Sequence, residues 1–270
     1  MKEADFVSPS VPSSDFLVRG KKMRPKFLTI PIILVLTTLA CQSTSSVTMQ
    51  VTRHPEPELP PISLAPFEAA GCTFDEYGSG ECSQDSSLVE LGCDHLRKPD
   101  DLLGGLDPAY PLALCLYYPL QHATEAQGNP MDEPRFYNDG CMMPMFVRYA
   151  IFKDGNFEVL STLDELSATY TPIESPEEAL SYSLAATGLE ARYGQQRVLG
   201  YRYFVNRLED TYVRQVDEGY QVNLYDYQVC GCGPHTTSIV TIEVAANGNI
   251  HTLEEKPAYE NPEDDGLCVD

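Results

Sequence analysis

The stretch that decides the fold reads Ser175-Pro-Glu-Glu-Ala-Leu-Ser-Tyr-Ser-Leu-Ala-Ala-Thr-Gly188, and it carries helix signals at both ends. Ser175 and Glu178 have the spacing of a capping box, in which each side chain bonds the other residue's backbone N–H. Pro176 falls at the first helical position, where its missing N–H costs no hydrogen bond. Gly188 can adopt the left-handed conformation that ends a helix, so the sequence predicts a helix between these caps.

One narrow apolar stripe is expected along this helix. Leu180 and Leu184 lie four residues apart, beside a row of small side chains formed by Ala179, Ser183 and Ala186. This spacing turns one side of a helix toward a core, and the small residues favour a close approach to a sheet.

Strand patterns stand on both sides of the helix. Residues 145–152 and 157–159 alternate in polarity and are separated by Asp154-Gly155, a strong two-residue hairpin signal because both turn positions need a positive φ. Thr162 and Glu165 offer a second, weaker capping box, which predicts a short helix that ends before Pro172.

Five more strands are expected after the helix, at 198–205, 211–216, 220–230, 238–245 and 249–254. Asn247-Gly248 separates the last two and again predicts a hairpin turn. Within 220–229 the apolar phase changes between Leu224 and Tyr225, which predicts either a bulge or a strand that is buried on both faces.

These elements predict an α+β fold: an antiparallel sheet with one or two packed helices, preceded by an irregular disulfide-rich segment. The helix followed by strands with an Asn247-Gly248 turn is similar in outline to cystatin-like and PepSY-like modules. That resemblance implies an arrangement of elements and no activity, because one fold supports many functions.

The amino terminus has the pattern of a signal for export. Four basic residues, at 21, 22, 24 and 26, precede an apolar run at 27–39, and Ala40-Cys41 closes it. A basic region, a short apolar region and a small residue before a cleavage site are typical of a secretory signal peptide, here residues 1–40. The apolar run is too short for a predicted transmembrane span, and translation is expected to begin at Met23.

The junction Thr37-Thr38-Leu39-Ala40-Cys41 resembles the lipobox of bacterial lipoproteins, although Thr38 stands where Leu is usual. The resemblance implies cleavage before Cys41, acylation of that cysteine and attachment to a lipid bilayer. Gln42 after the cysteine implies the outer membrane. A plain secretion signal with a chance cysteine is the alternative.

Cysteine counting supports export. The chain has nine cysteines, and assigning Cys41 to lipid leaves an even number, as expected of disulfides in an oxidising compartment. The eight candidates are Cys72, Cys82, Cys93, Cys115, Cys141, Cys230, Cys232 and Cys268. Spacing leaves about 105 pairings open. We favour Cys93 with Cys115, and Cys141 and Cys268 with the Cys230/Cys232 pair.

Composition divides the rest of the chain into three parts. Residues 41–66 are rich in Ser, Thr and Pro and are predicted to form a solvated tether. Residues 67–140 have short apolar runs, many turn signals and four of the cysteines among residues 72–115, and we expect an irregular disulfide-rich segment there. Residues 141–270 are expected to form the α+β domain.

The charge of the chain excludes one class of function. Without residues 1–40, twelve basic and 37 acidic residues remain, a net charge of −25. Binding to nucleic acid is driven by counterion release at Lys and Arg, so no nucleic-acid partner is expected.

The one compact group of chemically reactive residues is Cys230-Gly-Cys232-Gly-Pro-His235. Two thiolates and an imidazole can hold copper or zinc, but a structural zinc site takes four ligands, and exported thiols are usually oxidised. The sequence contains no Gly-x-Ser-x-Gly, no His-Glu-x-x-His and no phosphate-binding glycine loop. We therefore expect no cofactor, with Cys230, Cys232 and His235 as an alternative metal site.

Two tyrosine rows, Tyr201/Tyr203 and Tyr225/Tyr227, could form a platform for sugar or peptide, or simply fill half-buried faces of a sheet. The function predicted from the sequence is that of a membrane-anchored exported lipoprotein, a non-catalytic binding or structural module of the cell envelope whose ligand or partner protein the sequence does not identify. The alternative is an exported metal-binding protein or hydrolytic enzyme that uses the loop at 230–235.

Overall fold

A computed structural model describes residues 49–93, 95–118, 136–137 and 140–269. The predicted signal peptide, the lipobox-like junction with Cys41 and the first residues of the predicted tether lie outside the described residues. The fold is α+β, as predicted, with two main antiparallel sheets, few helices and four disulfides.

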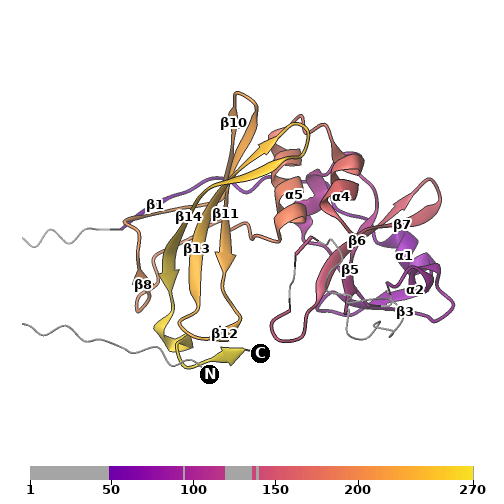
Figure 1. Ribbon diagram of the computed structural model, residues 1–270, viewed down its shortest axis with the longest axis horizontal. Coiled ribbons are helices and arrows are strands. Elements are labelled where there is room, and N and C mark those ends of the chain that lie inside the picture. The colour runs from indigo at the N-terminus through magenta and orange to yellow at the C-terminus, as the bar shows by residue number, and fades with distance from the viewer. Residues whose placement is uncertain (1–48, 94, 119–135, 138–139, 270) are drawn as a thin grey trace, which may run out of the picture. The chain divides into compact units, whose positions relative to one another are not determined.

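The first sheet is antiparallel throughout and follows the order β2-β3-β4-β5-β6-β7 (Figure 1). Its strands are β2 (Cys72–Phe74), β3 (Ser79–Cys82), β4 (His95–Arg97), β5 (Leu112–Tyr117), β6 (Phe146–Lys153) and β7 (Asn156–Leu160). Between β6 and β7, Asp154 has φ 50° and Gly155 has φ 83°. Both positive values confirm the predicted two-residue hairpin.

The boundary predicted at residue 140 is wrong. β5 pairs with β6 over six residues, from Leu112 opposite Ile151 to Tyr117 opposite Phe146. Residues on both sides of 140 therefore share one sheet, the segment predicted to be irregular supplies its strands β2 to β5, and the described residues belong to one unit. The pairing escaped prediction because backbone hydrogen bonds between distant strands leave no mark in local composition.

The second sheet follows the order β10-β11-β13-β14-β8. Its strands are β10 (Tyr212–Val216), β11 (Gly219–Tyr227), β13 (Thr236–Ala245), β14 (Ile250–Glu260) and β8 (Arg202–Tyr203). The β13–β14 hairpin turns at Asn247-Gly248 as predicted, with Gly248 at φ 83°. β14 is longer and β8 shorter than the predicted strands, and two register shifts lie between β13 and β14.

β11 is the strand that is buried on both faces. Its consecutive residues Val222 to Tyr225 are all buried, and its register with β13 is regular along its length. Of the two predicted explanations for the change of apolar phase, the second is confirmed. Val222 and Leu224 face the main core, whereas Tyr225 belongs to a separate cluster on the other face.

The two longer helices are α4 (Leu163–Tyr170) and α5 (Pro176–Thr187). Both helices begin where predicted, and Thr162 and Glu165 form the expected capping box. At α5 only half of the predicted box forms: the Ser175 hydroxyl accepts from the Glu178 N–H, but the Glu178 carboxylate accepts from the Glu174 N–H instead of that of Ser175. Gly188 ends α5 at φ 69°. Four short helices complete the described set, α1 (Ala65–Ala69), α2 (Ser87–Glu90), η1 (Asp101–Gly105) and η2 (Pro262–Asp264).

The prediction of a narrow apolar stripe on α5 is wrong, because residues 179–186 are all buried. The helix packs against strands of both sheets (Figure 1). On one side the Tyr149 hydroxyl of β6 donates to the Ala185 carbonyl at 2.8 Å; on the other the Tyr182 hydroxyl donates to the Gly248 carbonyl at 3.1 Å. The Ser181 hydroxyl, also buried, bonds the Leu102 carbonyl and the Gly105 N–H of η1.

The predicted tether is partly folded. β1 (Gln50–Thr52) pairs in parallel with β9 (Arg207–Glu209), and Leu59 and Ile62 pack against the main core. The described part of residues 41–66 is therefore bound to the folded unit, contrary to the prediction. Composition favoured a solvated chain because Pro and polar residues predominate, but a few apolar side chains and three paired residues are enough to hold it.

All eight cysteines that were expected to form disulfides do so. The pairs are Cys72–Cys82, Cys93–Cys115, Cys141–Cys230 and Cys232–Cys268. The favoured pairings agree with these bonds. The third bond links the segment before β6 to the loop that follows β11, so it ties the two sheets together covalently.

Replacing Gly188 with alanine should lower the free energy of unfolding by about 1–2 kcal/mol, as urea denaturation would measure. An alanine Cβ there would meet the Tyr137 ring at 2.6 Å and would also oppose the left-handed backbone. Gly155→Ala is the matched control: it has φ 83°, and among the described residues no atom lies within 4 Å of the place that its Cβ would take. Equal losses for the two variants would contradict a role of the Tyr137 contact.

Candidate functional site

A pocket of about 600 Å³ opens on the face of the second sheet that points away from α5. Because side chains alternate along a strand, Tyr227 of β11 and Thr237 of β13 lie on the same face as Tyr225 and Ile239, whereas Leu224 and Val240 enter the main core. The floor is a small apolar cluster whose buried members are Leu208, Tyr225, Ile239 and Ala258. We call this site the tyrosine pocket.

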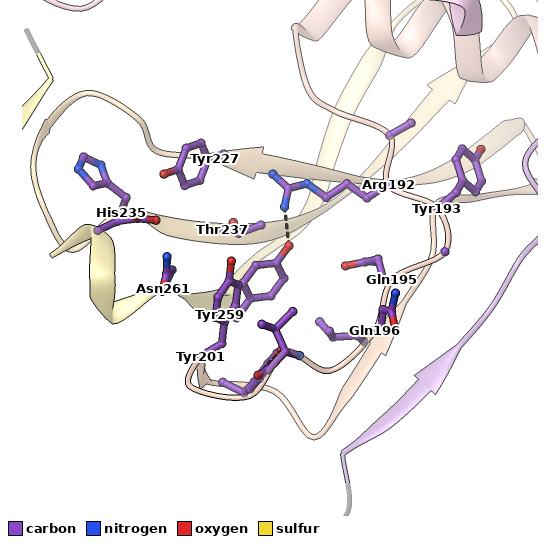
Figure 2. Close-up of a pocket in the computed structure, with 16 residues that line it drawn as sticks. Arg192, Tyr193, Gln195, Gln196, Tyr201, Tyr227, His235, Thr237, Tyr259 and Asn261 are labelled. Carbon is purple, nitrogen blue, oxygen red and sulfur yellow. Dashed lines mark hydrogen bonds between the residues drawn. The ribbon is translucent and has the colours of Figure 1, made fainter. Parts of the chain in front are cut away.

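Tyrosine rings dominate one wall of the pocket (Figure 2). Tyr201, Tyr203 and Tyr259 form a three-ring cluster, with ring centroids 5.7–6.4 Å apart and tilted planes. Tyr227 also lines the pocket. Of the four residues in the predicted tyrosine rows, three therefore lie at the pocket, while Tyr225 is 0% exposed and packs beneath it.

An ion pair holds the strand that carries the tyrosine cluster. Arg202 of β8 pairs with Glu260 of β14, whose side chain is 4% exposed. The Arg202 guanidinium also lies 3.6 Å from the Asp265 carboxylate. The Tyr203 hydroxyl then accepts from the Val198 N–H at 2.8 Å, which fixes the loop before β8. These contacts position the rings although β8 itself has only two residues.

Arg192 is the cation of the pocket, and no pattern in the sequence pointed to it. Its guanidinium donates to the Glu190 carboxylate from Nε at 3.1 Å and from Nη2 at 2.7 Å, and Nη1 donates to the Tyr259 hydroxyl (Figure 2). It also lies 5.7 Å from the ring centroid of Tyr225 and 5.9 Å from that of Tyr259, within cation–π range. Burial alone lowers the pKa of Arg192, but Tyr259 and Glu190 outweigh it and raise the pKa, so the charge persists.

Asp210 organises the 194–195 loop, which supplies a second wall of the pocket, and it too was absent from the predicted site residues. It is 1% exposed, and its carboxylate accepts three backbone N–H groups: from Gly194 at 3.1 Å, from Gln195 at 3.0 Å and from His54 at 3.3 Å. One carboxylate therefore holds the 194–195 loop to the segment that follows β1. No spacing in the sequence joins these residues, so pattern reading had no signal for them.

Two side-chain amides, those of Gln195 and Asn261, use one end in hydrogen bonds within the fold and leave the other end for the pocket. Gln195 uses its NH₂ group on the Glu209 carbonyl and the Tyr225 hydroxyl, so its Oε1 is the atom that it can offer as an acceptor. Asn261 uses its Oδ1 to accept from the Glu263 N–H, so its Nδ2 is the donor that it can offer. The pocket thus presents a neutral acceptor and a neutral donor.

The end of the chain closes the pocket. Asn261 and Asp264 belong to the segment that includes η2, and the Cys232–Cys268 disulfide with the paired strands β12 (Gly231–Cys232) and β15 (Cys268–Val269) holds that segment against the loop after β11.

The alternative metal site at 230–235 is wrong for this structure. Cys230 and Cys232 point to different partners in separate disulfides, so neither sulfur is a thiolate. His235 is 3% exposed; its Nδ1 lies 3.0 Å from the Gln228 carbonyl oxygen and its Nε2 lies 3.3 Å from that of Leu267. Within the described ranges, no three His, Cys, Asp or Glu side chains lie together as metal ligands.

Three phenol groups in and beneath the pocket, those of Tyr193, Tyr225 and Tyr227, remain protonated at ordinary pH. Burial raises the pKa of Tyr227, and it raises the pKa of Tyr193 to about 12 with the help of Glu56 and Asp210. Tyr225 beneath them also has a raised pKa, again mainly through burial. A neutral phenol both donates and accepts a hydrogen bond, so the tyrosines add polar contacts without charge.

Comparison with protein-family models, curated proteins and solved structures finds no match to this chain. The geometry of the pocket therefore carries what is said below about binding. In the described part of the chain, no helix is long and apolar enough to cross a membrane.

Proposed function

We propose that the protein is a membrane-anchored exported lipoprotein of the cell envelope, and that it acts as a non-catalytic binding module whose ligand enters the tyrosine pocket. The observation that carries the binding role is the pocket itself: about 600 Å³, lined by aromatic rings and a few converging polar groups. This volume lies within the range of small-molecule sites.

Export and anchoring are supported by the sequence at 21–41 and, weakly, by the disulfides. A chain with four disulfides is compatible with an oxidising compartment. The lipobox-like Thr37 to Cys41 junction supports lipid attachment at Cys41. The described unit would then lie outside the cytoplasm, with Gln42 favouring the outer membrane.

Binding is favoured over hydrolysis by the way the polar groups of the pocket are used. Both ring nitrogens of His235 face carbonyl oxygens, and Arg192 is occupied by Glu190 and Tyr259. A general base must be able to reach the proton that it removes, and His235 and Arg192 are already engaged. Asp264 is the one carboxylate among the described residues that line the pocket, whereas glycoside hydrolysis uses a pair of them. The arrangement suits a site that recognises a molecule without changing it.

Cys41→Ser should move the protein out of the membrane fraction and abolish its labelling by radioactive palmitate. The reason is that the thiol accepts the lipid, and a serine hydroxyl does not replace it in this processing. Fractionation with membrane and soluble markers checks the result, and Cys72→Ser is the matched control because Cys72 lies in a disulfide. Palmitate labelling that persists in the serine variant would contradict anchoring at Cys41.

The proposed binding of a ligand in the tyrosine pocket is tested with an extract of the soluble small molecules released from purified envelopes. We expect this extract to change the tyrosine fluorescence of the purified protein, which contains 16 Tyr and no Trp, and Tyr259→Ala to reduce the change. An extract that binds the alanine variant as well as the parent would contradict a role of the tyrosine pocket.

A further inference from the structure

We propose that the ligand of the tyrosine pocket is an uncharged carbohydrate, a short oligosaccharide or the end of a glycan. This inference rests on the proposed binding function and adds the chemical class of the ligand. Three features of the pocket support it: its exposed ring surfaces, its neutral polar groups and the balance of its charges.

The ring surfaces suit a sugar. A pyranose has an apolar face of C–H groups with hydroxyls at its rim, so it needs an aromatic surface edged with hydrogen-bonding groups. Tyr201, Tyr203 and Tyr259 supply tilted, half-buried rings. The hydroxyls of Tyr203 and Tyr259 already bond the Val198 backbone and Arg192, so the ring surface is what the cluster offers to a sugar, and neighbouring side chains supply the hydrogen bonds.

The polar groups are of the kind that hydroxyls match. A sugar hydroxyl donates one hydrogen bond and accepts others, so a site for it needs both donors and acceptors. Gln195 can offer an oxygen, and Asn261 an N–H. Asp264 adds a carboxylate at the rim, which accepts from hydroxyl pairs.

The charges argue against an anionic ligand. Arg192 is the cation among the pocket residues, and the Glu190 carboxylate already pairs with it at 2.7 Å. Nearby, Arg202 is likewise paired, with Glu260 and Asp265, and Asp264 adds a negative charge at the pocket, on a chain whose net charge is −22. A negatively charged ligand would be repelled by these carboxylates and would bind less tightly, whereas a neutral ligand would not be repelled.

A peptide fits the pocket less well. Extended peptides gain affinity by adding a strand to a free sheet edge. The edge beside the pocket is β8, which has only two residues, and Phe204 adds one more bond to β14 by donating its N–H to the Ala258 carbonyl at 2.9 Å. Little backbone is available there for a peptide to pair with, so side-chain stacking would have to supply the affinity.

The test divides the envelope extract into three portions. One is untreated, one is oxidised with periodate, which cleaves the vicinal diols of sugars, and one is digested with protease; excess reagents are removed before use. The purified mature protein is kept in a detergent without a sugar headgroup, and tyrosine fluorescence with calorimetry reports binding. Cellobiose, maltotriose and N,N′-diacetylchitobiose are titrated as defined probes, with digalacturonate as the charged comparison.

The expected result is binding that survives protease and is lost with periodate. Tyr201→Ala should weaken binding of the protease-treated extract about threefold to tenfold, whereas Tyr201→Phe, which keeps the ring, should stay within about twofold. Tyr77→Ala is the matched control, since Tyr77 is 84% exposed and lies outside the pocket. At least one neutral probe should bind more tightly than digalacturonate.

Two results would overturn the proposal, and they differ. Binding that is lost with protease and kept after periodate would assign the pocket to a peptide, leaving the binding function intact and the carbohydrate class wrong. An extract with no effect that depends on Tyr201 or Tyr259 would remove the proposed function itself. Circular dichroism of each variant shows whether a loss of binding comes from unfolding.

Discussion

Asp210→Asn should lower the free energy of unfolding by about 2–4 kcal/mol, and it should reduce binding at the tyrosine pocket. The Asp210 carboxylate is 1% exposed and accepts backbone N–H groups from His54, Gly194 and Gln195. An amide of the same shape turns an NH₂ group toward some of these donors, leaving buried N–H groups unpaired. A charge-assisted hydrogen bond contributes about 1.5–3 kcal/mol, and an unsatisfied buried group costs a similar amount.

Urea denaturation measures the decrease in the free energy of unfolding, and amide hydrogen exchange shows which part of the structure Asp210→Asn loosens. Exchange should accelerate at Gly194 and Gln195 and remain slow at buried positions of α5 such as Ala185. Asp217→Asn is the matched control, because the same substitution occurs at an exposed turn. A loss below about 0.5 kcal/mol for Asp210→Asn would contradict its role as the organiser of the pocket wall.

The double variant Cys141→Ser, Cys230→Ser should be the most destabilised of the four disulfide deletions, by about 4.6 kcal/mol. The bond joins residues 89 positions apart, against 36, 22 and 10 for the other three. In the chain-entropy account, removing a bond returns more freedom to the unfolded chain when the closed loop is longer. The order of losses should therefore follow the order of these separations.

Cys72→Ser with Cys82→Ser is the comparison, since that bond closes the shortest loop and is expected to contribute about 3 kcal/mol. Denaturant unfolding of all four double variants under one condition checks the order. If removing Cys141–Cys230 lowers the free energy of unfolding less than removing Cys72–Cys82 does, the longer loop does not restrict the unfolded chain more, and the prediction is wrong. Mass spectrometry confirms that the other three bonds remain.

Much of the local structure could be predicted because its signals lie within a few residues of one another. The caps of α5 at Ser175 and Gly188 and the turn at Asp154-Gly155 depend on conformations that those residues themselves prefer. The even cysteine set likewise followed from counting. The predicted tyrosine rows also led to the pocket, because three of their four members line it.

The remaining features depend on contacts between distant parts of the chain. The β5–β6 pairing joins residues on both sides of a segment that looked like a boundary, and it made the predicted division at 140 wrong. Arg192 and Asp210 were missed for the same reason: each looks like an ordinary charged residue until Tyr259 or His54 is brought beside it.

The sequence by itself determined an α+β chain, the ends of its two main helices, two hairpins and the residues available for disulfides, because each depends on neighbouring residues or on composition. Only the tertiary structure decided that α5 is buried between strands of two sheets, and that Arg192, the tyrosines and Asn261 converge on one pocket. Burial and convergence are properties of long-range packing, and no local spacing encodes them.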